Sequence, residues 1–142
     1  MTVIDMKYKT IVIGSGRLGA NIARHLSKLG ESVDIVDIDP DAFRKISDDF
    51  SGNTIVGDAT DLSTLDLIEL KDAKRIVIVT GDDNYNVYVA HVALHFYDVP
   101  LIYVRLYDVA KGKLIEGTRI KPIYPFNLSL EAFLQLEGED LK

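Results

Sequence analysis

The sequence lacks cysteine altogether, carries less positive than negative charge, and contains no long apolar run. Without cysteine it forms no disulfide and offers no thiolate to a metal, which agrees with a reducing compartment. Its 16 lysines and arginines against 22 aspartates and glutamates give a net charge of −6, which disfavours binding to polyanionic nucleic acids. No run approaches the ~18 apolar residues of a membrane span, and residues 1–10 lack the apolar centre of a signal peptide. We therefore expect a soluble, cytoplasmic protein with no nucleic-acid partner.

Short apolar segments alternate with helical patterns along the 142 residues, a length that suits one domain. The segments with strand character are Tyr8–Ile13, Ser32–Ile38, Thr54–Val56, Arg75–Thr80, Leu101–Leu106 and Ile120–Tyr124. Those with helical periodicity are Arg17–Leu29, Asp41–Phe50, Leu62–Leu70, Asn84–Tyr97 and Val109–Glu116. Right-handed crossovers between them predict an α/β fold, a Rossmann-like doubly wound parallel sheet of six strands in the order 3-2-1-4-5-6. Its ligand crevice is expected at the carboxyl ends of strands one and four.

The last part of the chain is expected to leave this domain. Pro122 and Pro125 interrupt the pattern, so we place the domain at residues 1–126 and a C-terminal helix within residues 127–142. The helix spans Leu128–Leu136 and is apolar enough to lie on a partner subunit as a dimer crossover. Packing on its own domain is the alternative.

A glycine-rich turn joins the first predicted strand to the first predicted helix. Gly14 permits a tight exit from the strand, Gly16 lets the backbone approach a pyrophosphate, and Gly19 lets the helix lie close to the sheet. The amino end of the helix would face the phosphates with unpaired N–H groups and a partial positive charge. Arg17 can add a charge-assisted contact to a phosphate. Strand, glycine turn and helix together predict a dinucleotide site.

Asp37 ends the second predicted strand, at the distance from the glycines that a ribose-binding acid requires. Its carboxylate can accept two hydrogen bonds from an adenosine ribose and would repel a 2′-phosphate. This favours NAD or an adenine nucleotide over NADP. Asp39, directly before Pro40, is expected to cap the next helix instead.

Two more turns are expected to reach the same crevice. After the third strand, Asp58 or nearby backbone groups would meet the edge of an adenine, although Asp58 or Thr60 can equally cap the helix that starts near Asp61. After the fourth strand, Thr80 and Gly81 are expected to line the ligand, while Asp82 or Asp83 caps the following helix.

In order and spacing, these blocks resemble the TrkA-N or RCK amino-terminal domains that regulate potassium channels and Trk/Ktr potassium transporters. The matching segments are GSGRLG, VDID, GDAT, VTGDDNYN, IYVRLYD and GTRIKPIYP, between Tyr8 and Pro125. The resemblance implies a regulatory domain that binds NAD(H), ADP, ATP or AMP and shifts the arrangement of paired domains to gate a membrane channel or transporter. It implies a cytoplasmic location at the inner face of the membrane, through that partner.

Site residues carry over from the resemblance position by position. The phosphates would lie against Gly14, Ser15, Gly16, Arg17 and Leu18. The ribose would contact Asp37 and Ile38, and the adenine Asp58 and Ala59. Thr80, Gly81 and Arg105 would close the far side.

Two departures from the family pattern qualify these expectations. Many members continue into a second ligand-binding domain, whereas this sequence stops at Lys142, so it works alone or a separate chain supplies that domain. ATP-binding relatives tend to carry a metal-holding glutamate after the last strand's proline, where this chain has Phe126. That difference weakens the case for metal-assisted ATP sensing and leaves NAD(H) as the first choice.

The predicted helix over residues 85–97 contains no charged residue and is apolar around much of its circumference. Such a helix should be covered on more than one side, which predicts a homo-oligomer, either a dimer or a ring.

We expect neither catalytic nor metal-binding residues. Tyr107 and Lys111 have the spacing of a short-chain dehydrogenase pair, but Tyr107 comes directly off a strand rather than from inside a helix. His91 and His95 are spaced as two metal ligands without a third. A small NAD-dependent oxidoreductase or a soluble nucleotide-binding adaptor are the alternatives to a regulatory domain.

Overall fold

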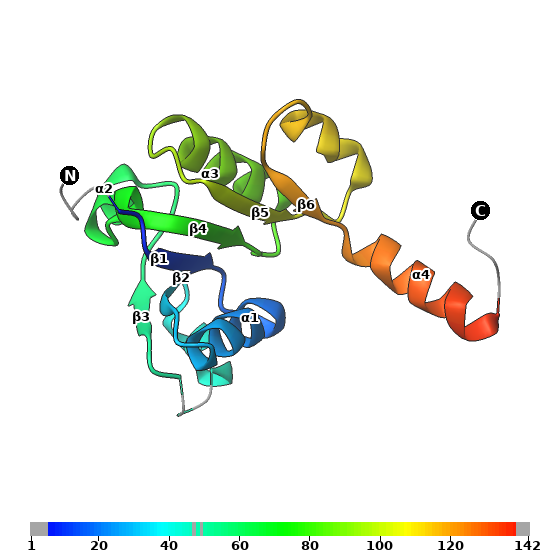
Figure 1. Cartoon of the computed structure of the whole chain (residues 1–142), viewed down its shortest axis with the longest axis horizontal. Helices are drawn as coiled ribbons and strands as arrows, with labels where there is room; N and C mark the ends of the chain where they lie inside the picture. The colour runs from blue at the N-terminus through cyan, green and yellow to red at the C-terminus, as the bar shows by residue number, and fades with distance from the viewer. Residues whose placement is uncertain (1–5, 47, 49, 139–142) are drawn as a thin grey trace.

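Six parallel strands form one sheet at the centre of the fold (Figure 1). The computed structural model describes residues 6–46, 48 and 50–138. The strands are β1 (Lys9–Ile13), β2 (Ser32–Asp37), β3 (Asn53–Val56), β4 (Ala73–Ile78), β5 (Leu101–Arg105) and β6 (Lys121–Ile123). Their order, β3-β2-β1-β4-β5-β6, confirms the predicted doubly wound α/β fold.

Helices cover both faces of the sheet because neighbouring residues of a strand point to opposite sides. Ile11 and Ile13 belong to a core shared with α2 (Leu62–Leu67) and α3 (Asp83–His95). Val12 belongs to a second core, beneath α1 (Arg17–Lys28) and the 3₁₀ helix η2 (Pro40–Lys45). Two further 3₁₀ helices, η3 (Leu70–Asp72) and η4 (Val109–Ile115), contribute to the first core. The central strands β1, β2 and β4 are therefore largely buried on both faces, as a parallel sheet requires.

Two predicted helices, Asp41–Phe50 and Val109–Glu116, are wrong in type because both segments form 3₁₀ helices, and the first is wrong in length as well. The chain forms the 3₁₀ helix η2 and becomes extended at Ile46, with ψ at 135°. Asp39 accepts a hydrogen bond from the Asp41 amide and Pro40 follows it, so the start agrees with the cap predicted there. Residues 47 and 49 lie outside the described residues. Ile46 and Phe50 pack on the core beneath α1, and this packing takes the place of further helical turns.

The apolar helix α3 is covered by its own chain. Val87, Val89, Ala90, Val92 and Ala93 are buried, because α3 lies against β4 and β5 on one side and η4 on another. Its low charge is therefore explained within one subunit, and it no longer argues for an oligomer. Tyr88 on α3 and Phe96 directly after it remain exposed.

The last helix, α4 (Pro125–Glu137), projects away from the sheet (Figure 1). None of its residues is buried, so the alternative in which it packs on its own domain is not adopted. Among the described residues, no helix combines the length and the apolar character needed to cross a membrane.

Candidate functional site

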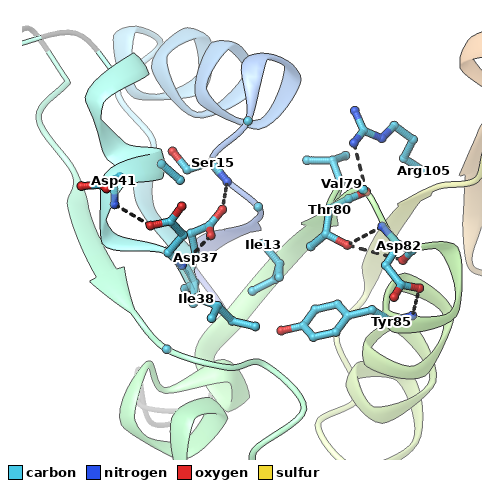
Figure 2. A pocket seen from close by; sticks show the side chains of 17 residues that line it. Ile13, Ser15, Asp37, Ile38, Asp41, Val79, Thr80, Asp82, Tyr85 and Arg105 are labelled. Carbon is cyan, nitrogen blue, oxygen red and sulfur yellow. Dashed lines mark hydrogen bonds between the residues drawn. The ribbon is translucent and has the colours of Figure 1, made fainter.

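A cavity of about 630 Å³ opens at the carboxyl ends of the central strands (Figure 2). β1 leads into α1 on one face of the sheet, and β4 leads into α3 on the other face. The two connections therefore diverge, and the space between them is the topological switch point of a doubly wound sheet. Its walls come from the turns that follow β1, β2, β3 and β4 and from the end of β5.

The glycine turn after β1 forms the upper wall of the cavity. Gly14 has a φ of +103°, which L-residues rarely adopt, and a Cβ there would lie 3.0 Å from the Thr80 nitrogen. A Cβ on Gly19 would lie 1.8 Å from the Gly14 carbonyl oxygen, so α1 approaches the turn as closely as backbone atoms permit. A Cβ on Gly16 would meet no atom within 4 Å, and Gly16 borders the cavity. The turn thus presents bare backbone to this space.

The amino end of α1 differs from that of α3 in how it is capped. Gly16 provides no side-chain cap, and the first turn of α1 holds no acidic residue. At α3, the Asp82 carboxylate accepts hydrogen bonds from the amides of Asn84 and Tyr85. The first-turn amides of any helix have no acceptor within it, so those of α1 remain available to an anion.

Two polar atoms of the cavity lining are buried without a partner. They are Oγ of Ser15, in the glycine turn, and Nε of Arg105, at the end of β5. Buried polar atoms are normally hydrogen-bonded, and such exceptions call for an explanation. Both residues face the same cavity, so a polar ligand placed there fits these unused groups.

Asp37 is held at the cavity wall by two backbone amides. Its Oδ2 accepts from the Ser15 amide at 2.7 Å and its Oδ1 from the Asp39 amide at 2.9 Å. A carboxylate has about four lone-pair positions, so capacity for further donors remains. The carboxylate therefore joins the end of β2 to the glycine turn and still faces the cavity.

Asp58 and Ala59 lie behind the cavity wall and both bind Tyr85. Asp58 Oδ1 accepts from the amide and the hydroxyl of Thr60, at 2.9 and 2.8 Å, and from the Tyr85 hydroxyl at 3.0 Å. These donors, Thr60 first, hold the pKa of Asp58 below its usual range despite some burial. Ala59 is fully buried, and its amide donates to the Tyr85 oxygen at 2.8 Å. Neither Asp58 nor Thr60 caps α2, which begins after Asp61, so that alternative is wrong.

The far side of the cavity is a network around the end of β4. Arg105 donates to the Thr80 carbonyl at 3.0 Å, and its guanidinium lies 5.0 Å from the centre of the Tyr107 ring. The Asn86 amide donates to the carbonyls of Thr80 and Arg105, at 3.1 and 2.9 Å. Asn86 is fully buried, so these contacts fix the turn after β4.

The structure gathers most of the predicted site residues around this one cavity. The predicted residues that line it are Gly14, Ser15, Gly16, Asp37, Ile38, Thr80, Gly81 and Arg105. Those outside its lining are Arg17, Leu18, Gly19, Asp58 and Ala59. Arg17 is exposed on α1, and Leu18 packs on the core beneath that helix. Their ligand contacts stay predictions.

Several lining residues were not identified from the sequence. Asp41, Ala42 and Gly57 border the cavity, and so does Tyr85 from the first turn of α3. The position of Tyr85 in the sequence could have identified it as a lining residue. It comes three residues after the Asp82 cap, at the start of the helix that follows the switch point.

The strand order, the glycine turn and the acid at the end of β2 define a doubly wound domain of the Rossmann class. Within that class the chain belongs to the TrkA-N domain family, which it matches over residues 10–123.

Full-length relatives of this family are similar in sequence. The Trk system potassium uptake protein TrkA homolog of Pyrococcus abyssi is 34% identical over 109 residues, covering 77% of this chain and 48% of the relative. The Trk system potassium uptake protein TrkA of Streptomyces coelicolor is 29% identical over 113 residues, covering 80% and 51%. The chain thus spans about half the length of these relatives.

Solved structures share the fold. The TrkA-N domain of the inner membrane protein ybaL from Escherichia coli superposes with a TM-score of 0.79 at 15% identity, covering 93% of this chain and 98% of that one. GsuK bound to ADP gives a TM-score of 0.75 at 20% identity, covering 94% and 35%, and the GsuK channel bound to NAD gives 0.73 at 15%, covering 92% and 23%. The Kef CTD of Shewanella denitrificans in its AMP-bound form gives 0.68 at 26%, covering 90% and 81%.

Proposed function

We propose that this chain is a nucleotide-binding regulatory domain of a potassium transporter or channel, with NAD(H) as its ligand and ADP, ATP or AMP as alternatives. The observation that carries the proposal is the cavity itself. It combines an uncapped helix amino end, an acid held at the end of β2, and two buried polar atoms without partners. Relatives named as potassium uptake proteins, and neighbours solved with NAD, ADP and AMP, support both halves of the proposal.

We assign a different part of the cavity to each part of a dinucleotide. The pyrophosphate would lie at the amino end of α1, where the amides beyond Gly16 supply donors and a partial positive charge. The adenosine ribose would bind the remaining lone pairs of Asp37. The second half of the ligand would lie toward Thr80 and Arg105. The carboxylates of Asp37, Asp39 and Asp41 border the ribose end and would repel a 2′-phosphate, so NAD is favoured over NADP.

The role we propose requires binding and no reaction. A ligand shifts the arrangement of paired subunits only by as much as its affinity differs between the two arrangements. Such a shift would be passed to a membrane transporter or channel subunit at the cytoplasmic face, directly or through a separate chain that supplies a second ligand domain.

Isothermal titration calorimetry with NAD⁺, NADH, NADP⁺, ADP, ATP and AMP tests the proposal. We expect binding of NADH, with NADP⁺ weaker by about tenfold or more, which corresponds to about 1.4 kcal/mol. Asp37→Ala should lower the affinity for every adenine nucleotide by a similar factor. Asp61→Asn is the matched control, because Asp61 is exposed and makes no side-chain bond to the helix it precedes.

Two results would contradict the proposal. If Asp37→Ala binds nucleotides as tightly as wild type, the assignment of Asp37 to the ribose is wrong. If none of the nucleotides binds to the wild-type protein, the proposed nucleotide site is wrong. Oxidation of NADH by simple carbonyl compounds in the presence of the protein would point to an oxidoreductase instead.

A further inference from the structure

Tyr85 joins the two walls of the cavity at the place where the base of an adenine nucleotide is expected. It belongs to α3, and Figure 2 shows its ring reaching from that helix toward Ile38. Its hydroxyl contacts the turn after β3, accepting from the Ala59 amide at 2.8 Å and donating to Asp58 Oδ1 at 3.0 Å. Tyr85 lines the cavity, whereas Asp58 and Ala59 do not. The side chain therefore stands between the cavity and the groups expected to recognise adenine.

The hydroxyl acts as donor and acceptor at the same time. Burial raises the pKa of Tyr85 to about 12, and the carboxylate of Asp58 adds to the rise although the Ala59 amide opposes it. The hydroxyl is therefore protonated at neutral pH. Its proton points to the Asp58 carboxylate, which can only accept, and its lone pair receives the Ala59 N–H, which can only donate.

An adenine edge has the same pair of functions. On its Watson–Crick edge, the exocyclic N6 donates and the ring nitrogen N1 accepts. N6 would donate to Asp58 and the ring nitrogen would accept from the Ala59 amide, in the place of the Tyr85 hydroxyl. A hypoxanthine has an acceptor oxygen in place of N6 and an N–H at the neighbouring position. In this position the hypoxanthine oxygen would face the Asp58 carboxylate, and the hypoxanthine N–H would face the Ala59 N–H. Both contacts are repulsive.

We infer that the Tyr85 hydroxyl is a built-in substitute for the adenine edge, which the base must displace from Asp58 and Ala59 on binding. The inference rests on the proposed nucleotide site and adds how that site selects its base. In the ligand-free protein the hydroxyl supplies the buried Ala59 N–H with its acceptor. It also adds a donor to Asp58 Oδ1, which already accepts from the amide and hydroxyl of Thr60. Binding exchanges these bonds for equivalent ones, so the substitute lowers affinity while it keeps the free site ordered.

The test removes the hydroxyl and keeps the ring. Tyr85→Phe leaves the Ala59 amide without its acceptor, so we expect ADP to bind about fivefold or more tightly, given the net contribution of a single hydrogen bond. Inosine diphosphate should bind wild type more weakly than ADP and should gain little from the substitution. Tyr88→Phe is the matched control, since Tyr88 is an exposed tyrosine of the same helix and should leave both affinities unchanged.

The outcomes separate the inference from the proposed function. If wild type binds ADP and Tyr85→Phe binds it equally or more weakly, the Tyr85 hydroxyl is not displaced by the base. The proposed nucleotide site is then unaffected. An equal gain for inosine diphosphate overturns base selection by this pair. Absence of binding by all variants, with their folding verified by circular dichroism, overturns the nucleotide site and the inference with it.

A measurement on the unmodified protein avoids dependence on any variant. In the free protein, NMR should detect a nuclear Overhauser contact between the Tyr85 ring and the Ala59 amide proton, as their hydrogen bond requires. Saturating ADP should abolish that contact. Its persistence in the complex would overturn the inference.

Discussion

Gly16 is the residue directly before α1 and Gly19 lies in the first turn of that helix, and the structure gives the two glycines different tasks. Added methyl groups would meet opposite surroundings, open space at Gly16 and the Gly14 carbonyl oxygen, 1.8 Å away, at Gly19. Gly16 has φ of −74° and ψ of −166°, which alanine adopts without strain. One glycine thus leaves the cavity side of the turn open, and the other permits the close packing of α1.

The same substitution at the two sites should separate these tasks. Gly19→Ala should lower the free energy of unfolding by about 2 kcal/mol or more, because overpacking against backbone cannot be relieved by a side-chain rotation. Gly16→Ala should unfold like wild type but bind NADH about tenfold more weakly, since its methyl group enters the phosphate space. Urea denaturation and calorimetry measure the two effects. Equal stability losses at both positions would contradict the assignment.

At this scale, the sequence predicts residues whose chemistry is fixed by local geometry. Gly14, Gly19 and Asp37 take up predictable places because a strand, a turn and a helix in succession determine where they lie. Tyr85 was not foreseen, because its role depends on a contact with Ala59, 26 residues earlier in the chain and on another element. Contacts of that range follow from the packing of whole elements, which no local pattern specifies.

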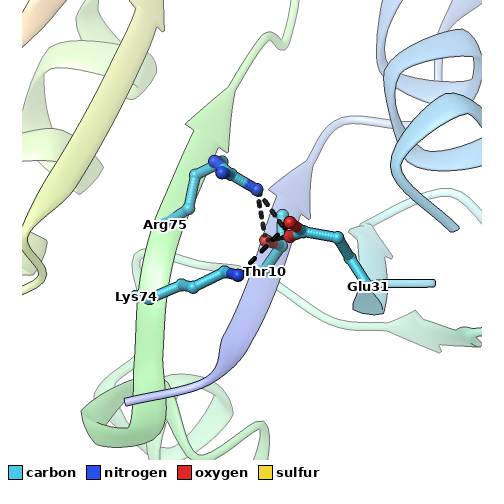
Figure 3. A network of polar contacts seen from close by, with 4 residues as sticks. All are labelled: Thr10, Glu31, Lys74 and Arg75. Carbon is cyan, nitrogen blue, oxygen red and sulfur yellow. Dashed lines mark hydrogen bonds and ion pairs between the residues drawn. The ribbon is translucent and has the colours of Figure 1, made fainter. Parts of the chain in front are cut away.

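Among the elements, β1, β4 and the segment after α1 are joined by a cluster of polar side chains (Figure 3). Glu31 accepts from Thr10 at 3.1 Å, from Lys74 at 3.2 Å and from Arg75 at 2.7 Å. Burial raises the pKa of Glu31, but the hydrogen bonds from Arg75, Lys74 and Thr10 outweigh it, so the net pKa lies below the ordinary 4.5. The cluster closes the end of the sheet opposite the cavity.

This cluster should make stability depend on acid pH. A carboxylate whose pKa is lower in the folded state stabilises it above the unfolded pKa, and that contribution is lost as pH falls through the folded pKa. Glu31→Gln should therefore lower the free energy of unfolding by about 1 kcal/mol at pH 7 and by much less near pH 3. Urea denaturation at the two pH values measures the difference.

The control for this prediction is another ion pair. Asp41 and Arg44 lie 3.3 Å apart, but their side chains are 70% and 81% exposed. Asp41→Asn should change the free energy of unfolding by a few tenths of a kcal/mol at most, because exposed pairs contribute little. A loss in Glu31→Gln that is the same at both pH values would contradict the ionic origin of its effect.

Strand positions were easier to predict from the sequence than helix types. A buried parallel strand is rich in apolar β-branched residues, and such residues dominate the segments that end at Ile13 and Asp37. The segments after Pro40 and Val109 have helical composition, yet both form 3₁₀ helices. Asp39 and Asp108 start them in the same way, by accepting from the amide two residues on, and the packing that ends them comes from distant parts of the chain.

The C-terminal helix α4 is left uncovered by the rest of the described chain. Phe126, Leu130 and Phe133 recur at helical spacing and are 66%, 46% and 58% exposed. An open, mainly apolar groove of about 440 Å³ lies beside α1, and its lining includes Ile22, Leu26 and Tyr103. Large contiguous apolar patches are rare on the surfaces of soluble monomers, and where they occur they usually mark an interaction site.

Self-association through α4 is therefore the expectation that remains after α3 proved to be covered internally. We predict that the wild-type chain sediments as a dimer or larger species at micromolar concentration, and that Leu130→Asp combined with Phe133→Asp makes it monomeric. Both residues lie outside the core, so the thermal unfolding midpoint of the monomer should reflect only the loss of association. Leu67→Asp is the matched control, because Leu67 is a 75% exposed leucine at the end of α2. Since ligand-dependent regulation requires at least two subunits whose arrangement can change, a wild-type monomer at these concentrations would remove both this interface and the proposed means of signalling.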